Sequence, residues 1–353
     1  MILSRLTLQQ FRSYTKRTIE FSPGLSLIVG DNTVGKTNIL EAIYTLATGK
    51  SFRADMDREM IRWDEEVGRI IGVGDDTKLE VVLTPGVVGG EHAPLKKYLV
   101  NGVSRRMIDF IGNLRAVLFW PEQLELVTDS PSIRRRYLDS VLVQVDREYR
   151  RNLQSYERGL RQRNRLLDFI NEGTASKSQL LFWNQLLIKT GSYITDIRTK
   201  FINFINNDLV SINSYQLAYD KSVISEARLV QYAEEEIAAK ATLVGPHRDD
   251  ITFYKQGKKE LLDLSKYGSR GEQRLAILWL KLAEVAYIEK TTGERPILLL
   301  DDIFSELDEE HRELVLDVMK KQQTIVTSAE QEILILLKRK HADITVIPLE
   351  GRK

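Results

Sequence analysis

The fold is decided by one stretch near the amino terminus, Gly30-Asp31-Asn32-Thr33-Val34-Gly35-Lys36-Thr37. It matches the phosphate-loop pattern G-x-x-x-x-G-K-[ST] at every fixed position. Residues 25–29 before it are apolar and partly β-branched, as in a buried strand, and residues 38–43 after it have helical spacing. This strand–loop–helix setting is the one in which the motif binds phosphate.

Each part of the loop suits a triphosphate. Glycines at both ends let successive backbone N–H groups turn toward an anion at the positive end of the following helix. Lys36 is placed to reach the β- and γ-phosphates, and the hydroxyl of Thr37 is placed to bind Mg²⁺. The alternative is a glycine-containing turn without a ligand, which four fixed positions in the right setting make the weaker interpretation.

Length and composition limit the protein class. The 353 residues suffice for about two domains, and the absence of cysteine with only four histidines argues against disulfides and zinc. No export signal is visible and no apolar run approaches ~20 residues, so we expect no membrane span and a cytoplasmic location. Because the net charge is only +1, any nucleic-acid site must come from local clustering of charge.

Short strands are predicted on both sides of the phosphate loop. They cover residues 2–8, 18–21, 68–74, 79–83, 97–100 and 115–120, with 324–327 as the last core strand. The runs between 68 and 100 are separated by Gly, Pro and Asn-Gly turns, which predicts an antiparallel meander.

The composition changes after residue 130. From residue 133 to 169, Gly159 is the lone helix breaker, and apolar residues recur at steps of three or four. We expect one helix here, roughly 55 Å long at about 1.5 Å per residue. Residues 171–174 read as a helix stop, and helical spacing resumes over 179–212. Two long helices joined by a polar turn predict a helical hairpin, too short for an extended coiled coil.

The first of these helices is rich in arginine. Residues 131–170 hold ten Arg against five Asp or Glu. Spacings of four, seven and seven place four arginines on one face: Arg147, Arg151, Arg158 and Arg165. One interpretation is a ridge that contacts the phosphates of duplex DNA. The other, favoured by the arginines alone, is a solvated face with i,i+4 ion pairs.

Three later segments complete the chemistry. An apolar helix begins with Ser269, Gly271 and Glu272. By themselves these residues predict a capping box. In a chain that also has a phosphate loop, they indicate an ABC-type signature, which binds a γ-phosphate held by a second subunit. An apolar strand at 296–300 ends in Asp301, suited to Mg²⁺, and Asp302, suited to polarising the attacking water. His247 lies beside acidic residues with no second ligand at metal spacing, so we interpret it as a structural hydrogen-bonder.

Together these motifs resemble the RecF family, bacterial recombination-repair ATPases related to SMC proteins. The resemblance is carried by Phe11-Arg12-Ser13-Tyr14, residues 35–42, 119–124, 131–139, 245–250 and 268–274, and Asp301-Asp302. The chain departs from the family pattern at Thr33, Glu272 and Gln123, where members usually have Gly, Gln and an acidic residue. The first two departures bear on the hydrolysis rate more than on ATP binding.

The resemblance implies an α/β fold: an ABC-type P-loop ATPase head, with a mixed sheet, helices and an antiparallel β meander, and an inserted all-helical second lobe. Residues 1–125 and 241–353 would form the head, and 126–240 the helical arm lobe. The implied nucleotide-binding residues are Gly30, Asp31, Asn32, Thr33, Val34, Gly35, Lys36, Thr37, Asn38 and Arg12, with Ser269, Gly271 and Glu272 acting on the partner's nucleotide. The implied catalytic residues are Lys36, Asp302 and Gln123, and the implied Mg²⁺ ligands are Thr37 and Asp301.

The implied activity is weak, DNA-stimulated ATP hydrolysis by a homodimer that forms on ATP and separates after hydrolysis. The dimer would bind duplex DNA at gap junctions and, with RecR and RecO, help RecA displace single-strand binding protein. One alternative is an ATPase subunit of an ABC transporter, against which the Arg-rich insert argues. Another is a short SMC-like structural DNA organiser, which would need a far longer coiled coil.

Overall fold

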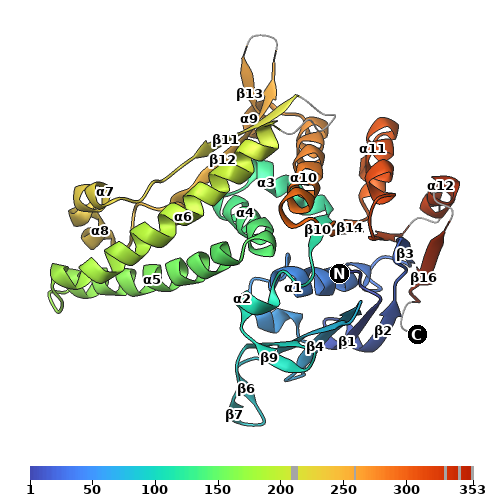
Figure 1. Cartoon of the computed structure of the whole chain (residues 1–353), viewed down its shortest axis with the longest axis horizontal. Helices are drawn as coiled ribbons and strands as arrows, with labels where there is room; N and C mark the ends of the chain where they lie inside the picture. Colours follow the sequence, from blue (N-terminus) through green and yellow to red (C-terminus); the bar gives the residue numbers. More distant parts are fainter. Residues whose placement is uncertain (208–213, 258–259, 330–331, 341–342, 351–353) are drawn as a thin grey trace. The chain divides into compact units, whose positions relative to one another are not determined.

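The computed structural model describes residues 1–207, 214–257, 260–329, 332–340 and 343–350 (Figure 1). The chain forms two compact units, Met1–Gln123 with Ile288–Lys353, and Leu124–Tyr287. The first boundary lies close to the predicted one. The second differs, because residues 241–287 belong to the second unit, where the strand that follows Asp249 pairs with an earlier strand of the same unit.

A parallel sheet forms the centre of the first unit. Its order is β10 (Ala116–Phe119), β14 (Ile297–Asp301), β15 (Thr324–Ser328), β3 (Leu25–Val29) and β16 (Ile344–Pro348). Every neighbouring pair is parallel. The predicted bounds of the phosphate-loop strand are confirmed. The prediction that β15 is the last core strand is wrong, since β16 pairs with β3 along its whole length.

The second sheet of this unit is the predicted antiparallel meander. Its order is β2 (Tyr14–Glu20), β1 (Arg5–Phe11), β4 (Gly68–Gly74), β5 (Thr77–Leu83), β8 (Lys96–Val100) and β9 (Val103–Arg105). A small hairpin of β6 (Val87–Val88) and β7 (Glu91–His92) leaves it between β5 and β8. Alternation along β1 buries Leu6 and Leu8 completely, which fixes the face that β1 turns to the core.

Helix α1 (Lys36–Thr48) packs against strands of both sheets. Its apolar residues lie nearly all round the helix, which is why it is buried on more than one side. The phosphate loop therefore ends at the first turn of a helix held between two sheets. The remaining elements of this unit are η1 (Asp57–Met60), α2 (Met107–Phe110), η5 (Ile303–Glu306), α11 (Glu309–Met319) and α12 (Glu332–Lys340).

The second unit is built on three helices, α4 (Pro131–Val145), α5 (Arg147–Asn171) and α6 (Leu180–Asn207). The predicted single helix over 133–169 is wrong, because the backbone is extended at Asp146. The Asp146 carboxylate accepts the N–H groups of Glu148 and Tyr149 at 2.8 and 2.9 Å, so it caps the start of α5.

The helical hairpin itself is confirmed in α5 and α6, which pack along each other. Gly159 permits this approach, since an added Cβ would lie 3.1 and 3.2 Å from Leu186 and Leu187. The predicted end of the second helix, at 208–212, lies outside the described residues.

An antiparallel sheet packs beside these helices in the order β11 (Tyr215–Asp220), β12 (Asp250–Gln256), β13 (Leu261–Asp263). The prediction of an all-helical second lobe over 126–240 is therefore wrong, since β11 lies within that range. The boundary between the units falls within α10 (Arg270–Thr292), the helix predicted to follow Ser269. The shorter elements are η2 (Pro121–Leu124), α3 (Glu125–Thr128), η3 (Lys177–Gln179), α7 (Glu226–Gln231), α8 (Ala233–Ala239), η4 (Pro246–Arg248) and α9 (Leu264–Tyr267). No helix in the described part of the chain is both long and apolar enough to span a membrane.

Candidate nucleotide-binding site

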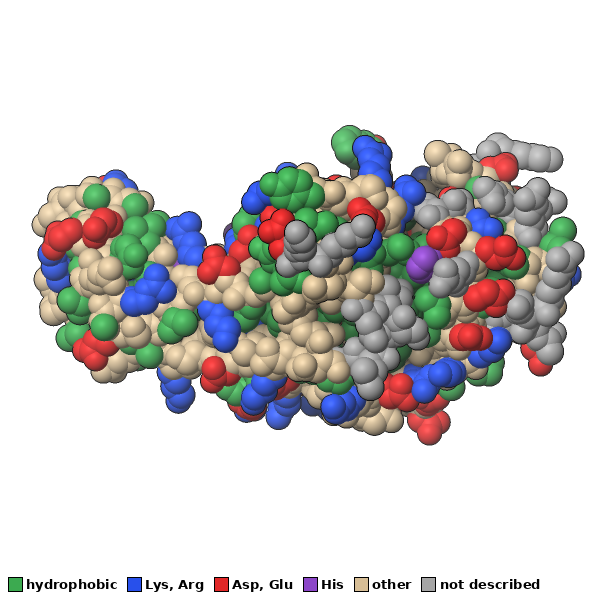
Figure 2. All heavy atoms as spheres, turned by 90° about the horizontal axis from the view of Figure 1, so that it is seen from above, with side chains coloured by type: hydrophobic (Ala, Val, Ile, Leu, Met, Phe, Trp, Pro, Cys, Tyr) green, Lys and Arg blue, Asp and Glu red, His purple; other side chains and the backbone are tan. Residues whose placement is uncertain are grey.

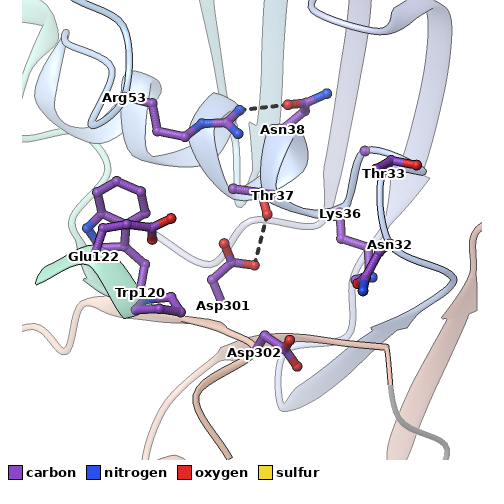
Figure 3. A pocket seen from close by; sticks show the side chains of 12 residues that line it. Asn32, Thr33, Lys36, Thr37, Asn38, Arg53, Trp120, Glu122, Asp301 and Asp302 are labelled. Carbon is purple, nitrogen blue, oxygen red and sulfur yellow. Dashed lines mark hydrogen bonds between the residues drawn. The ribbon is translucent and has the colours of Figure 1, made fainter. Parts of the chain in front are cut away.

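The phosphate loop borders a pocket of about 330 Å³ in the first unit (Figure 3). Of the predicted residues, those lining it are Asn32, Thr33, Gly35, Lys36, Thr37, Asn38, Asp301 and Asp302. The sequence did not single out the other lining residues, which are Arg53, Trp120, Pro121 and Glu122. The carboxyl end of β14 thus meets the amino end of α1, although the two segments are far apart in the chain.

Backbone geometry explains why the loop needs its second fixed glycine. Gly35 has φ +104°, and an added Cβ would lie 2.8 Å from the hydroxyl of Tyr14. Thr33 also has a positive φ, +73°, which is unfavourable for a β-branched side chain. The departure from Gly at position 33 therefore places strain in the loop itself.

The loop lysine is held by the loop. Lys36 Nζ donates to the carbonyl oxygens of Gly30 and Asp31 at 2.7 and 2.9 Å. These two residues contribute through their backbone and do not line the pocket; Val34 does not line it either. Burial lowers the pKa of Lys36, although nearby carboxylates, that of Asp302 foremost, oppose this shift.

Two oxygen ligands suited to Mg²⁺ lie together at the pocket. The Thr37 hydroxyl donates to Asp301 Oδ1 at 3.2 Å (Figure 3), and the Thr327 hydroxyl donates to the same oxygen at 2.5 Å. Hydroxyl and carboxylate oxygens fit Mg²⁺, which is commonly held by one or two such groups and by substrate phosphates. Among the described residues, no group of three or more His, Cys, Asp or Glu could hold a metal ion without a substrate.

Arg12 does not line the pocket. Its Nε and Nη2 donate to the two carboxylate oxygens of Glu41 at 2.9 and 2.6 Å, and its Nη1 donates to the Glu59 carbonyl. Glu41 is fully buried, and although burial by itself raises its pKa, the hydrogen bond from Arg12 and the charge of Arg53 hold that pKa below its usual value. The guanidinium at the pocket is that of Arg53, which donates to Glu41 and to Asn38 at 2.6 Å each.

Gln123 also lies outside the pocket lining. Its Nε2 donates to the Leu118 carbonyl at 2.9 Å, and its Oε1 accepts the Trp120 N–H at 3.4 Å. The preceding residue, Glu122, lines the pocket instead, and Figure 3 shows its carboxylate on the side where Thr37 and Asp301 meet. A catalytic role for Gln123 stays a prediction that this geometry does not favour.

The predicted signature segment lies at the start of α10, in the second unit. Ser269 and Glu272 form the predicted capping box: the Ser269 N–H donates to the Glu272 carboxylate at 2.9 Å, and the Glu272 N–H donates to Ser269 Oγ at 3.3 Å. Ser269 and Gly271 are exposed, and Glu272 is partly exposed. All three residues are therefore accessible to a ligand from outside this unit.

The four ridge arginines are all exposed on α5: Arg147, Arg151, Arg158 and Arg165. At about 100° per residue they share one helix face. Arg151 pairs with Glu148 at 2.7 Å, and Arg165 lies over the Phe169 ring. On the face in Figure 2, basic and acidic side chains are interspersed. Contact with DNA phosphates would therefore need a local group of basic side chains, such as these four arginines.

Two of the segments that carry the family resemblance meet inside the second unit. Arg134, from the 131–139 segment, binds both carboxylate oxygens of Asp250 at 2.6 and 2.9 Å. Arg198 of α6 joins Asp139 and Asp249, at 2.8 and 3.0 Å, and is 2% exposed. We call Asp139, Arg198 and Asp249 the buried ion cluster; these segments hold the helices and the sheet of this unit together.

His247 is a structural residue, as its sequence context indicated. Its Nε2 lies 2.9 Å from the Thr242 carbonyl, which can only accept, so Nδ1 of the neutral ring accepts from the Tyr156 hydroxyl at 2.7 Å. Burial lowers the pKa of His247 to about 4. Neither ring nitrogen is left for a metal ion.

Comparisons with known proteins agree with this architecture. A family model described as RecF/RecN/SMC N terminal domain matches residues 2–346. The DNA replication and repair protein RecF of Lachnoclostridium phytofermentans is 38% identical over 343 residues, which cover 93% of this chain and 92% of that protein. The protein of the same name from Herpetosiphon aurantiacus is 37% identical over 384 residues, covering 97% and 98%.

Solved structures give the same result. The structure of the recombination mediator protein RecF-ATP in the RecFOR pathway has a TM-score of 0.83 and 30% identity, covering 94% of this chain and 92% of that one. The corresponding RecF-ATPrS structure has a TM-score of 0.81 and 31% identity, covering 93% and 92%. The Smc head domain from Pyrococcus furiosus, at 17% identity and a TM-score of 0.50, covers 98% of this chain and 93% of that one and shares the ABC-type ATPase head fold. With a family model matched over nearly its whole length and relatives of more than 35% identity, this chain belongs to the RecF family.

Proposed function

We propose that this chain is an ATP-dependent recombination-repair mediator that acts on duplex DNA. ATP and Mg²⁺ at residues 30–37 join two copies, and the dimer binds duplex DNA near single-strand gaps. With RecR and RecO it promotes RecA loading, and slow, DNA-stimulated hydrolysis releases the dimer. The repair role is supported by relatives named as replication and repair proteins and by a solved relative described as a mediator of the RecFOR pathway.

One observation carries the ATP part of the proposal. The hydroxyl of Thr37 lies 3.2 Å from Oδ1 of Asp301, although the two residues are 264 positions apart in sequence. Both line the same pocket as Lys36. A Mg²⁺ ion held there would offset the negative charge of the transferring phosphate. Thr37 and Asp301 would hold that ion, while Lys36 would leave the loop carbonyls for the phosphates.

Asp302 is the residue that we assign to the attacking water. It lines the pocket directly after β14 and adopts a left-handed backbone, φ +50°, so that it does not continue the strand. A carboxylate there accepts a hydrogen bond from water and orients its oxygen toward the terminal phosphate. Ser269 and Gly271 of a second copy would bind the same phosphate from outside.

Sedimentation velocity tests the nucleotide-dependent dimer. With Mg²⁺ and a non-hydrolysable ATP analogue we expect dimers, and with ADP we expect single chains, because only the triphosphate is shared by two copies. If only single chains are seen in both conditions, at nucleotide concentrations well above the dissociation constant, the proposal is overturned.

The salt dependence of binding tests the DNA partner and the transporter alternative. If the arginine ridge neutralises about four phosphates, the log–log slope of affinity against salt is about −3.6, and removing Arg151 and Arg158 reduces it to about −1.8. Lys177→Ala, an exposed lysine paired with Glu234, is the control and leaves the slope unchanged. A transporter subunit would show no such binding, whereas a DNA-binding RecF-family protein working in the cytoplasm would show it.

A further inference from the structure

The first turn of α10 carries a carboxylate at the place where the partner's phosphate is proposed to bind. Besides its N–H, the Ser269 hydroxyl also donates to Glu272 Oε2, at 3.0 Å. A negative side chain at this position repels a triphosphate, more strongly as water is excluded between two copies. The chain therefore needs a compensating positive charge if this surface is to accept phosphate.

Lys255 supplies that charge. Its Nζ lies 2.7 Å from Glu272 Oε1, the carboxylate oxygen that the Ser269 bonds leave free. The side chains of both ion-pair partners are about one-third exposed, so the pair lies at the surface. The hydrogen bonds from Lys255 and Ser269 lower the pKa of Glu272 to about 2, and the carboxylate is ionised at neutral pH.

The position of Lys255 is fixed by the sheet. Lys255 lies on β12, the middle strand, opposite Tyr215 on one side and Leu262 on the other. The Tyr215 ring packs near Trp279 of α10, with ring centroids 6.0 Å apart. Since the strand is attached on both sides and the sheet contacts α10, the lysine is held at the start of this helix.

Gly271 leaves the backbone of the same turn uncovered. It is exposed, and the nearest described atom to an added Cβ is Ser269 Oγ at 4.0 Å. Packing within the described residues thus does not require glycine here. The missing side chain leaves the backbone at the start of α10 open to a ligand.

We propose that Lys255 is a positioning residue for the terminal phosphate of a nucleotide bound by a second copy of this chain, an inference that rests on the proposed function. Lys255 offsets the charge of Glu272. Its ammonium group also continues to donate a hydrogen bond to the Glu272 carboxylate. The Ser269 hydroxyl can then turn away from that carboxylate and donate its proton to the phosphate. Glu272 then remains the cap of α10 without repelling the partner's nucleotide.

A charge-rescue experiment tests this role. Dimerisation with Mg²⁺ and ATPγS is measured by sedimentation for wild type, Lys255→Met, Glu272→Gln and the double variant, and ATP affinity of single chains is measured separately. We expect Lys255→Met to weaken dimerisation about tenfold, as one uncompensated charge near a triphosphate does. In the Glu272→Gln background the lysine is dispensable, because glutamine also closes the capping box. Single-chain ATP affinity stays the same in all four.

Two controls separate this role from folding and from net charge. Lys255→Arg keeps the charge and should dimerise like wild type; Lys177→Met removes an exposed lysine paired with Glu234 and should do so too. The inference is overturned, provided that the wild type dimerises, in either of two cases. In the first, Lys255→Met weakens dimerisation equally with and without Glu272→Gln; in the second, it does not weaken dimerisation at all. Wild-type chains that fail to dimerise would instead overturn the proposed function, and with it this inference.

Discussion

The nucleotide pocket and the buried ion cluster both gather charged residues, but the surroundings of those residues differ. At the pocket, Thr37, Asp301 and Asp302 face a cavity, and Lys36 is held by backbone oxygens of its own loop. In the cluster, Asp249 is fully buried and accepts from Arg198, from the Tyr219 hydroxyl and from the Ser222 N–H. One region leaves its polar side chains along a cavity that a ligand can enter, and the other encloses them within the chain.

The difference teaches how to separate function from structure in this molecule. Sequence segments with equally dense polar residues serve either purpose, and only the partners of each side chain decide which. Substitution at the cluster should therefore change the free energy of unfolding, whereas substitution at the pocket should change nucleotide chemistry with little effect on that free energy.

The largest expected effect is at Arg198. Arg198→Met removes the cation between Asp139 and Asp249 and leaves two carboxylates without it, which should lower the free energy of unfolding by about 3–5 kcal/mol. Urea denaturation followed by circular dichroism measures this loss. Arg151→Met, an exposed arginine of the same helical hairpin, is the control, and a loss below about 1 kcal/mol at Arg198 would contradict the cluster's structural role.

The next effect is a pH dependence at His247. Its pKa is about 4 in the folded chain and about 6.5 in the unfolded chain. As the pH falls from 6.5 to 4, this histidine therefore gains a proton in the unfolded chain and stays neutral in the folded one. The free energy of unfolding should fall over that window, by about 3 kcal/mol at most. In His247→Gln this fall should be smaller, as measured by urea denaturation at several pH values. Identical pH profiles would rule out the buried neutral histidine.

Lys36→Ala tests the pocket without touching the cluster. Removal of the ammonium that reaches the phosphates should weaken ATP binding about a hundredfold, with an unchanged free energy of unfolding. Titration calorimetry measures the first and urea denaturation the second. Lys50→Ala, an exposed lysine just beyond α1, is the matched control. ATP binding of normal strength by the Lys36 variant would show that the loop does not hold the nucleotide.

The smallest effect distinguishes two neighbours, Glu122 and Gln123. Glu122 lines the pocket, so Glu122→Gln should slow ATP turnover about tenfold. Gln123 bonds the backbone of its own turn, so Gln123→Ala should cost about 1 kcal/mol of stability and little turnover. The reverse pattern would restore the assignment of catalysis to Gln123 that the sequence suggested.

The strand and the helix on either side of the phosphate loop could be predicted from the sequence because these parts have strict local rules. A phosphate loop requires a strand, glycines and a helix in one order, and β3 and α1 follow that order. Asp301 was found because it ends an apolar strand, and in a parallel sheet such ends gather at one edge.

The sequence could not predict features that depend on a single turn or on distant partners. Apolar spacing continues across Asp146, so periodicity alone does not reveal that α4 ends just before this residue and that its carboxylate caps the start of α5. Pro121 opens a 3₁₀ turn, η2, in which side chains rotate by about 120° per residue, so Glu122 and Gln123 point differently. Composition likewise does not separate the buried Arg198 from the exposed Arg158, since only packing decides that.

The position of β3 in its sheet has a consequence for synthesis on the ribosome. β3 pairs with β15 and β16, which are translated about 300 residues later, or roughly 15–60 s at about 5–20 residues per second. The second unit, residues 124–287, is continuous in the chain and can fold in that interval. β3 stays unpaired until β15 and β16 are synthesised, so a stalled or truncated polypeptide would contain a folded second unit and an incomplete parallel sheet behind the phosphate loop.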